Sequence, residues 1–384
     1  MDSDGLIPGE INADGPRLFS NEDFRGYETW DYAGGDFAGH VAYEDSLMTT
    51  GRFIHAEVLR HLTRNDGEGL TLAERAAGAV LAVSAAGDAH EPGYLPKPYG
   101  GLHKAAVSRG ISSDQYEHAL FGLWALRNVS QDQKLCGAIE QSIVRWAHYF
   151  RRHQFCYDYY GRVRVTPARA VHGLGLFLPL CLIAHRITGE TVFIEAMERQ
   201  LAPIVQGDFA EKVSSNPNTT NLTVMGLVYC WQHDVYRRLC ECGIETCVRR
   251  VLPRLSRDGL AYCYNGGSDT KPLEPGYRTG KPPLNYKFLL WRSNVKGADS
   301  CKVAHTLILA HRVLPEHGWR DQALRILERF AKPTDFLRYY DHDGRQIPPD
   351  YAYMRKCLCN QFVAAWLQTF FLAIRPSIGD PAVQ

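Results

Sequence analysis

The stretch LCNQFVAAWLQTFFLAI, residues 358–374, is apolar on nearly every side of the helix that it predicts. The stretch AVHGLGLFLPLCLIAHRI, which ends at residue 187, has the same character. Residues 190–206 and 319–332 instead predict amphipathic helices with one charged face. A helix that is apolar all round needs neighbours on all sides, whereas an amphipathic helix buries only one face. The sequence therefore predicts inner helices covered by outer ones.

Hydrophobic periodicity predicts a chain made mostly of helices. We expect them near residues 46–63, 72–86, 113–128, 131–152, 168–187, 190–206, 219–240, 243–257, 297–313, 319–332 and 358–374. Short links, such as Glu241-Cys242, join the two members of each pair. Long links connect one pair to the next: 87–112, 153–167, 207–218, 258–296 and 333–357. A short link is typical of two antiparallel helices, and a long one crosses to the next pair.

This alternation predicts the fold class. Six helical hairpins in succession favour an all-α (α/α)6 toroid, in which residues 46–384 form one domain. Residues 1–45 show no sustained period and are interpreted as an arm or lid packed on the toroid. The sixth outer helix is missing from the pattern, so the termini must supply it or leave a gap. Short β-hairpins are expected in the long loops at residues 155–165, 260–267 and 336–347.

The segment from Tyr94 to Asn128 carries the densest polar chemistry. Its first half is a loop rich in Gly, Pro and aromatic residues, and its second half is a helix with Ser112 or Ser113 as the N-cap. The start of that helix brings together an acid, an amide, a phenol and an imidazole: Asp114, Gln115, Tyr116 and His118. We interpret this helix start as a site. The structural alternative is that Asp114 only caps the helix and His118 lies on its surface.

Other candidate residues lie in the long loops and the arm. In a ring of hairpins these loops gather on one face with the inner-helix N-termini, where polar ligands are favoured. The residues expected to bind substrate, besides Gln115 and His118, are Trp30, Arg164, Asn221, Tyr286, Lys287, Trp291 and Arg292.

The composition excludes several classes of function. With 43 basic and 42 acidic residues, the net charge of +1 argues against a nucleic-acid partner or an acidic-membrane surface. No uncharged apolar run of about 18 residues occurs, so no membrane span is expected. The Gly-rich stretches 34–39 and 264–269 lack the strand-to-helix context of a nucleotide site. The 20 Tyr, 16 Phe and 7 Trp residues, many of them in loops, suit the apolar faces of sugars.

The 11 cysteines favour a reducing compartment. Most lie inside helical patterns and are interpreted as small buried hydrophobic residues. The N-terminal MDSDGLIPGE lacks the features of a signal peptide, so a cytoplasmic protein is expected. No His lies at ligand spacing near the cysteines of 240–247 or 357–359, and we predict no metal and no cofactor.

The motif SSDQYEHALFGLW, residues 112–124, resembles an inner-helix segment of the six-hairpin glycosidase superfamily. That superfamily includes unsaturated glucuronyl and rhamnogalacturonyl hydrolases, and it shares its toroid with polysaccharide lyases and sugar epimerases. The helical rhythm extends the resemblance over most of the chain. It implies an enzyme of carbohydrate metabolism and polysaccharide degradation whose substrate is a uronate-containing oligosaccharide. The hydrolases tend to have two adjacent carboxylates at this place, whereas this chain has Asp114 followed by Gln115.

Hydrolysis of a glycosidic bond requires a proton donor and usually a second carboxylate. We predict Asp114 as the donor. For the second carboxylate we favour Asp31 over Glu28, Asp341 and Asp343, because Trp30 and Tyr32 flank it as a sugar platform would.

Two alternatives remain open. A polysaccharide lyase would use His103 or Tyr116 as the base, with Asn221, Lys287 or Arg292 to neutralise the uronate. A non-catalytic sugar-binding toroid would keep the aromatic residues and would not need a titrating Asp114.

Overall fold

The computed structural model describes residues 1–25, 36–108, 110–159, 163–165, 173–205, 209–255, 261, 296–330, 332, 336–337 and 356–375. Its α-helices are α1 (Phe37–Tyr43), α2 (Ser46–Arg64), α3 (Gly67–Asp88), α4 (Ser113–Arg127), α5 (Gln133–Arg152), α6 (Gly173–Thr188), α7 (Thr191–Val205), α8 (Phe209–Lys212), α9 (Pro217–Gln232), α10 (Arg237–Val251), α12 (Lys296–Val313), α13 (Trp319–Leu327) and α14 (Asn360–Ile374). The short strands are β1 (Glu10–Asn12), β2 (Tyr157–Tyr159), β3 (Val163–Val165) and β4 (Cys357–Cys359).

The chain is mostly helical, and every helix predicted from the sequence has a counterpart. Local signals explain several of the ends. Asp66, Asp132 and Asn216 each accept a hydrogen bond from a backbone N–H in the first turn of α3, α5 and α9. Asn65 ends α2 in the left-handed conformation, with φ of 52°.

One predicted link between two helices is misplaced. The break between α9 and α10 falls at residues 233–236, not at Glu241-Cys242. Asp234 and Tyr236 have φ of 56° and 48°, which ends the right-handed helix there. Residues 237–240 keep a helical pattern of hydrophobicity, and they belong to the following helix. Periodicity shows that these residues are helical but does not show to which helix they belong.

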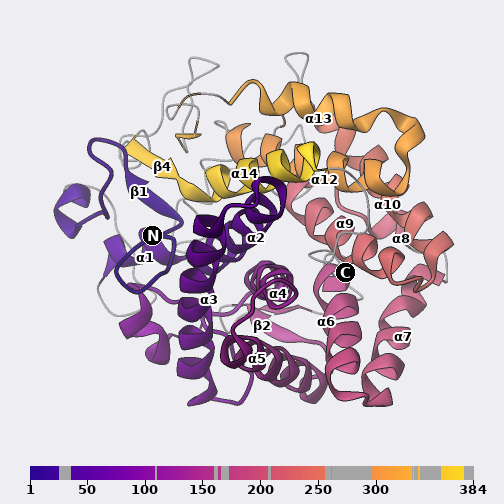
Figure 1. Ribbon diagram of the computed structural model, residues 1–384, viewed down its shortest axis with the longest axis horizontal. Helices are drawn as coiled ribbons and strands as arrows, with labels where there is room; N and C mark the ends of the chain where they lie inside the picture. Colours follow the sequence, from indigo (N-terminus) through magenta and orange to yellow (C-terminus); the bar gives the residue numbers. More distant parts are fainter. Residues whose placement is uncertain are drawn as a thin grey trace.

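The helices pack in pairs of sequence neighbours: α2 with α3, α4 with α5, α6 with α7, α9 with α10, and α12 with α13. The first member of each pair also contacts other first members. In particular, α2 packs against α4 and α14, and α9 packs against α6 and α12. In Figure 1, α3, α5, α7, α10 and α13 lie toward the periphery, and the apolar helices α6 and α14 lie further in. This agrees with the inner and outer character that the sequence predicts for them.

Glycines allow two pairs of helices to approach closely. A Cβ on Gly51 of α2 would overlap the backbone of His118 in α4, and a Cβ on Gly122 would overlap the Gly51 carbonyl. Gly175 of α6 and Gly226 of α9 meet in the same way. Any larger residue at these positions would separate the backbones, so the glycines determine how near the facing side chains come to one another.

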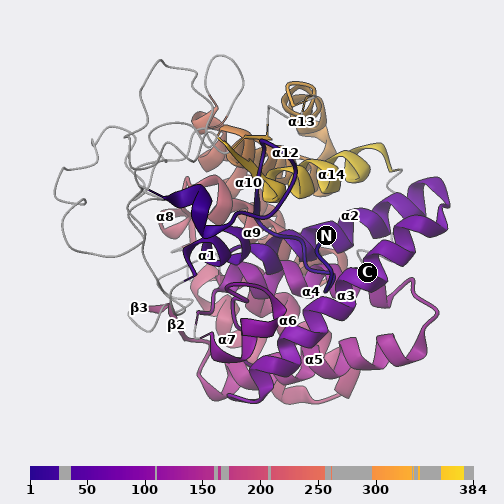
Figure 2. The same ribbon diagram turned by 90° about the vertical axis from the view of Figure 1, so that its left-hand side faces the viewer.

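The described part of the N-terminal arm is packed against α2 and α14. Strand β1 pairs antiparallel with β4, and Ile11 lies opposite Leu358. The backbone N–H of Ile7 donates to Thr50 Oγ1 at 2.9 Å, and the Asn360 side chain donates to the Pro8 carbonyl at 2.9 Å. Figure 2 shows this side of the molecule, with α1 and the N-terminus turned toward the viewer.

The predicted β-hairpin at residues 155–165 is confirmed, because β2 pairs antiparallel with β3. The other two predicted hairpins, 260–267 and 336–347, lie mostly outside the described residues. Among the described helices, α3 is long and apolar enough to cross a membrane by length and composition. This is weak evidence, because the core helix of a soluble protein passes the same test, and one face of α3 is packed on α2.

We predict that Gly51→Ala lowers the free energy of unfolding by about 1–3 kcal/mol or more, because its methyl group has no space at the contact of α2 with α4. The matched control is Gly78→Ala in α3, where an added Cβ meets nothing within 4 Å. That control should stabilise the protein by about 0.5–1 kcal/mol through helix propensity. Urea-induced unfolding measures both changes. Equal stability of the two variants would contradict the close approach.

Candidate functional site

The N-terminal ends of α2, α4 and α14 meet at one polar rim. The Gln115 side-chain amide of α4 donates to the carbonyl of Glu44, just before α2. Gln361 of α14 donates to Asp45 Oδ2 at 3.3 Å. Lys97 from the loop before α4 places Nζ 3.5 Å from Glu44 Oε1 and 3.9 Å from Asp45 Oδ1. Three helix starts and one loop therefore hold a cluster of carboxylates, amides and an ammonium group.

Asp114 belongs to the same rim, in the first turn of α4. Its Oδ1 accepts hydrogen bonds from the Gln115 backbone N–H at 3.0 Å and from the Ser112 hydroxyl. Its Oδ2 makes no hydrogen bond with any described residue. The side chain is only partly buried. The carboxyl group is therefore held in one orientation through one oxygen.

A buried polar network lies beneath the rim and joins four helices. Arg52 of α2 is fully buried and donates to Gln368 Oε1 of α14 at 2.9 Å and to Asn221 Oδ1 of α9 at 2.7 Å. The Asn221 amide contacts His305 Nδ1 of α12 at 2.9 Å, and the Gln368 amide contacts His55 Nδ1 of α2 at 2.8 Å. The predicted substrate-binding residue Asn221 thus links the inner helices to one another.

Glu117 and His118 of α4 are buried beside this network, and neither side chain has a hydrogen-bond partner among the described residues. Burial raises the pKa of Glu117 well above its usual value; the charge of Asp114 adds to this effect and the charge of Arg52 opposes it. Burial, together with Arg52, lowers the pKa of His118 well below its usual value. Both side chains are therefore expected to be neutral at neutral pH.

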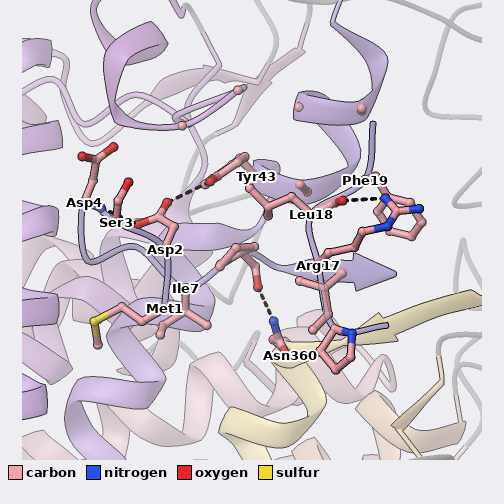
Figure 3. Close-up of a pocket in the computed structure, with 18 of the residues that line it drawn as sticks. Met1, Asp2, Ser3, Asp4, Ile7, Arg17, Leu18, Phe19, Tyr43 and Asn360 are labelled. Carbon is pink, nitrogen blue, oxygen red and sulfur yellow. Dashed lines mark hydrogen bonds between the residues drawn. The ribbon is translucent and has the colours of Figure 1, made fainter. Parts of the chain in front are cut away.

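A second candidate site is a cavity of about 790 Å³ beside the N-terminal arm. It lies between residues 1–19, α1, the loop at 100–103 and one side of α14, and Figure 3 shows the labelled side chains around it. Tyr43 donates to Asp2 Oδ2 at 2.8 Å. His103 is exposed and lines the cavity next to the ion pair between Lys104 and Asp36, whose Nζ and Oδ2 are 2.7 Å apart. Of the described lining residues, none belongs to α4.

The polar groups expected to converge at the start of α4 point to different places. Asp114 is only partly buried and lies at the rim, whereas Gln115 and His118 are both buried, so His118 is not on the surface. Tyr116 is fully buried; its hydroxyl donates to the Gly93 carbonyl at 2.8 Å and accepts from the Leu95 N–H at 2.6 Å. Its ring packs among aromatic residues of α5. These contacts are those of a core residue, and we do not propose Tyr116 as a base.

Several predicted site residues lie outside the described residues: Trp30, Asp31, Tyr286, Lys287, Trp291 and Arg292, with the alternatives Glu28, Asp341 and Asp343. Their roles stay predictions. Arg164 lies in β3 and pairs with Asp158 in the register of the hairpin. The structure does not describe its side chain. In the described part of the chain, no group of three or more His, Cys, Asp or Glu side chains is suited to hold a metal ion.

Sequence reasoning missed Arg52, Asp45 and Lys97. Arg52 and His55 stand three residues apart in the stretch LMTTGRFIHAEVL, where nearly every other residue is buried. A charged and a titratable residue about one turn apart, inside a helix that is otherwise buried, were the signal that could have revealed Arg52. For Asp45 and Lys97 no such signal exists, because their proximity depends on how the loop before α4 folds over α2.

The chain was compared with protein-family models and with curated proteins, and neither comparison gave a match. The function is therefore inferred from the geometry of the chain itself.

The buried histidines predict loss of stability in mild acid. Burial lowers the pKa of His55 to about 3 and lowers the pKa values of His118 and His305 well below the usual 6.5. In the unfolded chain each imidazole takes up a proton as the pH falls through about 6.5, while in the folded protein it stays neutral. The unfolded state then binds more protons, so stability falls with pH by about 1.4 kcal/mol per pH unit for each histidine.

Glu117 acts in the opposite direction, because its raised pKa lets the folded protein bind a proton first. The unfolded chain takes up about three protons at its histidines, and the folded protein holds one at Glu117. The difference of about two protons lowers the free energy of unfolding by roughly 3 kcal/mol per pH unit as the pH falls from about 6 to about 5. Urea unfolding at several pH values measures the slope. His118→Met should reduce it by about one proton, whereas the control His90→Gln, at an exposed position, should not. An unchanged slope in the His118 variant would contradict its burial as a neutral group.

Proposed function

We propose that the chain is a carbohydrate-active enzyme that hydrolyses a glycosidic bond in a uronate-containing oligosaccharide, and that residues 46–384 form an (α/α)6 toroid. Contacts support the ring: α2, α4, α6, α9, α12 and α14 each touch the next, and α14 touches α2. Each of the first five has an outer partner. Beside α14 and α2, the N-terminal segment takes the place where a sixth outer helix would lie.

The observation that carries the proposal is Asp114, a partly exposed carboxyl at an inner-helix N-terminus, fixed through one oxygen. In this mechanism its Oδ2, which has no partner among the described residues, donates a proton to the leaving glycosidic oxygen. Ser112 and the Gln115 backbone keep the carboxyl group oriented, so that little conformational freedom is lost when the substrate binds. The resemblance of residues 112–124 to the six-hairpin glycosidases supports the same role.

Among the described residues, Asp45 is a candidate for the second carboxylate, in addition to the Asp31 that the sequence predicts. It stands just before the first residue of α2, on the same rim as Asp114. Lys97 near Oδ1 and the Gln361 amide on Oδ2 favour its ionised form. An ionised carboxylate beside a proton-donating one is the arrangement that hydrolysis needs, with Asp45 activating the water.

The exposed His103 in the 790 Å³ cavity favours a second candidate function, elimination by a lyase. An imidazole in contact with solvent could remove the proton next to a uronate carboxylate. The two reactions leave different products. Hydrolysis gives a reducing sugar without new unsaturation, while elimination gives an unsaturated uronate that absorbs ultraviolet light.

We predict that Asp114→Asn lowers turnover roughly 10²–10⁴-fold, because an amide cannot donate the required proton. Reducing sugar released from a panel of uronate-containing glycans measures turnover. The matched control is Asp132→Asn, at the exposed N-cap of α5, where the amide oxygen can still accept the capping hydrogen bonds. It should leave turnover unchanged.

Near-full turnover of Asp114→Asn would remove Asp114 from the mechanism. An unsaturated product that disappears in His103→Ala would favour the lyase in place of the hydrolase. If the wild-type protein binds the glycans but releases no product, the chain is a sugar-binding protein.

A further inference from the structure

A cavity of about 30 Å³ lies inside the helical layer, between α2, α4, α9 and α12. It shares none of its described lining residues with the rim around Asp114 or with the cavity beside the arm. Its polar lining consists of His55, Trp124, Tyr229 and His305, and the other lining side chains are apolar. A cavity needs roughly 10–15 Å³ to hold one particle the size of a water molecule. This one therefore has room for one or two such particles.

The hydrogen bonds of Arg52 determine the tautomers of both histidines. A guanidinium group only donates, so Asn221 and Gln368 must turn their oxygens toward it. Each amide then turns its NH₂ group toward an imidazole, and Nδ1 of His305 and of His55 must accept. A neutral imidazole that accepts at Nδ1 carries its proton at Nε2. Two chains of hydrogen bonds thus run from one guanidinium to one cavity, and each ends in an N–H donor.

These donors have no partner in the described part of the chain. Nε2 of His55 and Nε2 of His305 are buried and unpaired, and the buried Nε1 of Trp124 interacts with the Tyr229 hydroxyl. The three side chains are 8%, 1% and 7% exposed. Among the polar lining side chains, only the Tyr229 hydroxyl can accept a hydrogen bond. Protonated imidazole nitrogens cannot ligate a cation, so the site is suited to an acceptor.

The charge around the cavity is positive. No described carboxylate lies within ion-pair distance of Arg52, whose contacts are the two neutral amides. Glu117 is the acid whose charge acts most strongly on Arg52, and burial raises the pKa of that carboxyl well above its usual value, which favours the neutral form. A buried cation without a counter-charge is unfavourable. Hydrogen-bond chains that start at a cation polarise the donors at their far ends.

We propose that this cavity binds one monatomic anion, chloride, held by the N–H groups of His55, His305 and Trp124. The anion supplies the counter-charge that Arg52 lacks. A water molecule fits less well, because it can accept only two hydrogen bonds and carries no charge to balance Arg52. The volume of about 30 Å³ favours a monatomic ion over sulfate, phosphate or a carboxylate ligand.

Thermal unfolding of the full chain tests the proposal, with sodium chloride compared to sodium gluconate at equal ionic strength. A ligand that binds only the folded state raises Tm with its concentration. Chloride should therefore raise Tm with a saturating dependence, and gluconate should not. Trp124→Phe keeps the ring but removes one donor, and it should increase the half-saturating chloride concentration roughly tenfold or more.

The matched control is Trp231→Phe, because the Trp231 indole donates to Glu241 at 2.9 Å, away from the cavity. It should leave the chloride dependence unchanged. Crystals soaked in sodium bromide give an independent reading, with an anomalous peak expected between His55 and His305. Equal Tm values in chloride and gluconate, an unaffected Trp124 variant, or a water molecule in place of bromide would each overturn the proposal. None of these outcomes depends on catalytic activity.

Discussion

The burial of the Arg52 guanidinium constrains the rest of the interior. A fully buried cation is tolerated only where its N–H groups find acceptors, since the desolvation cost is several kcal/mol. The acceptors are one side-chain amide from α9 and one from α14. These two bonds fix α2 between the two helices at one axial position, because a shift by one residue would turn Asn221 or Gln368 away. The same amides then orient His305 and His55, so one charge sets the hydrogen-bond direction across four helices.

Close backbone contacts make this arrangement possible. Gly51 and Gly122 bring α2 against α4, and Gly175 and Gly226 bring α6 against α9. At that separation Glu117 and His118 are in the interior together with Arg52. Burial shifts their pKa values in the directions that favour neutral forms, which leaves Arg52 as the charged group of this network. Asp45 and Asp114 lie further out, at the rim, where both side chains are only partly buried.

The sequence predicted the helices well because their signals are local. Apolar spacing, Asp or Asn at the N-caps and left-handed residues at the C-caps act within a few residues of each helix end. The exception at residues 233–236 has the same origin, because the turn there is made by Asp234 and Tyr236 and not by a glycine or proline. The candidate site was less predictable. Four polar residues at the start of α4 read as one cluster, but each helical residue turns by about 100°, so Tyr116 enters the core while Asp114 stays at the rim.

The sequence by itself determined a mostly helical chain, the alternation of buried and amphipathic helices, and the place of Asp114 in the first turn of its helix. Only the tertiary structure decided that Arg52, Asn221, Gln368 and two histidines form one network, and that Asp45 and Lys97 share the rim with Asp114. Those partners are separated by up to several hundred positions in the chain. Their contacts arise from the packing of whole helices, and a pattern that repeats every three to four residues carries no information about which helices become neighbours.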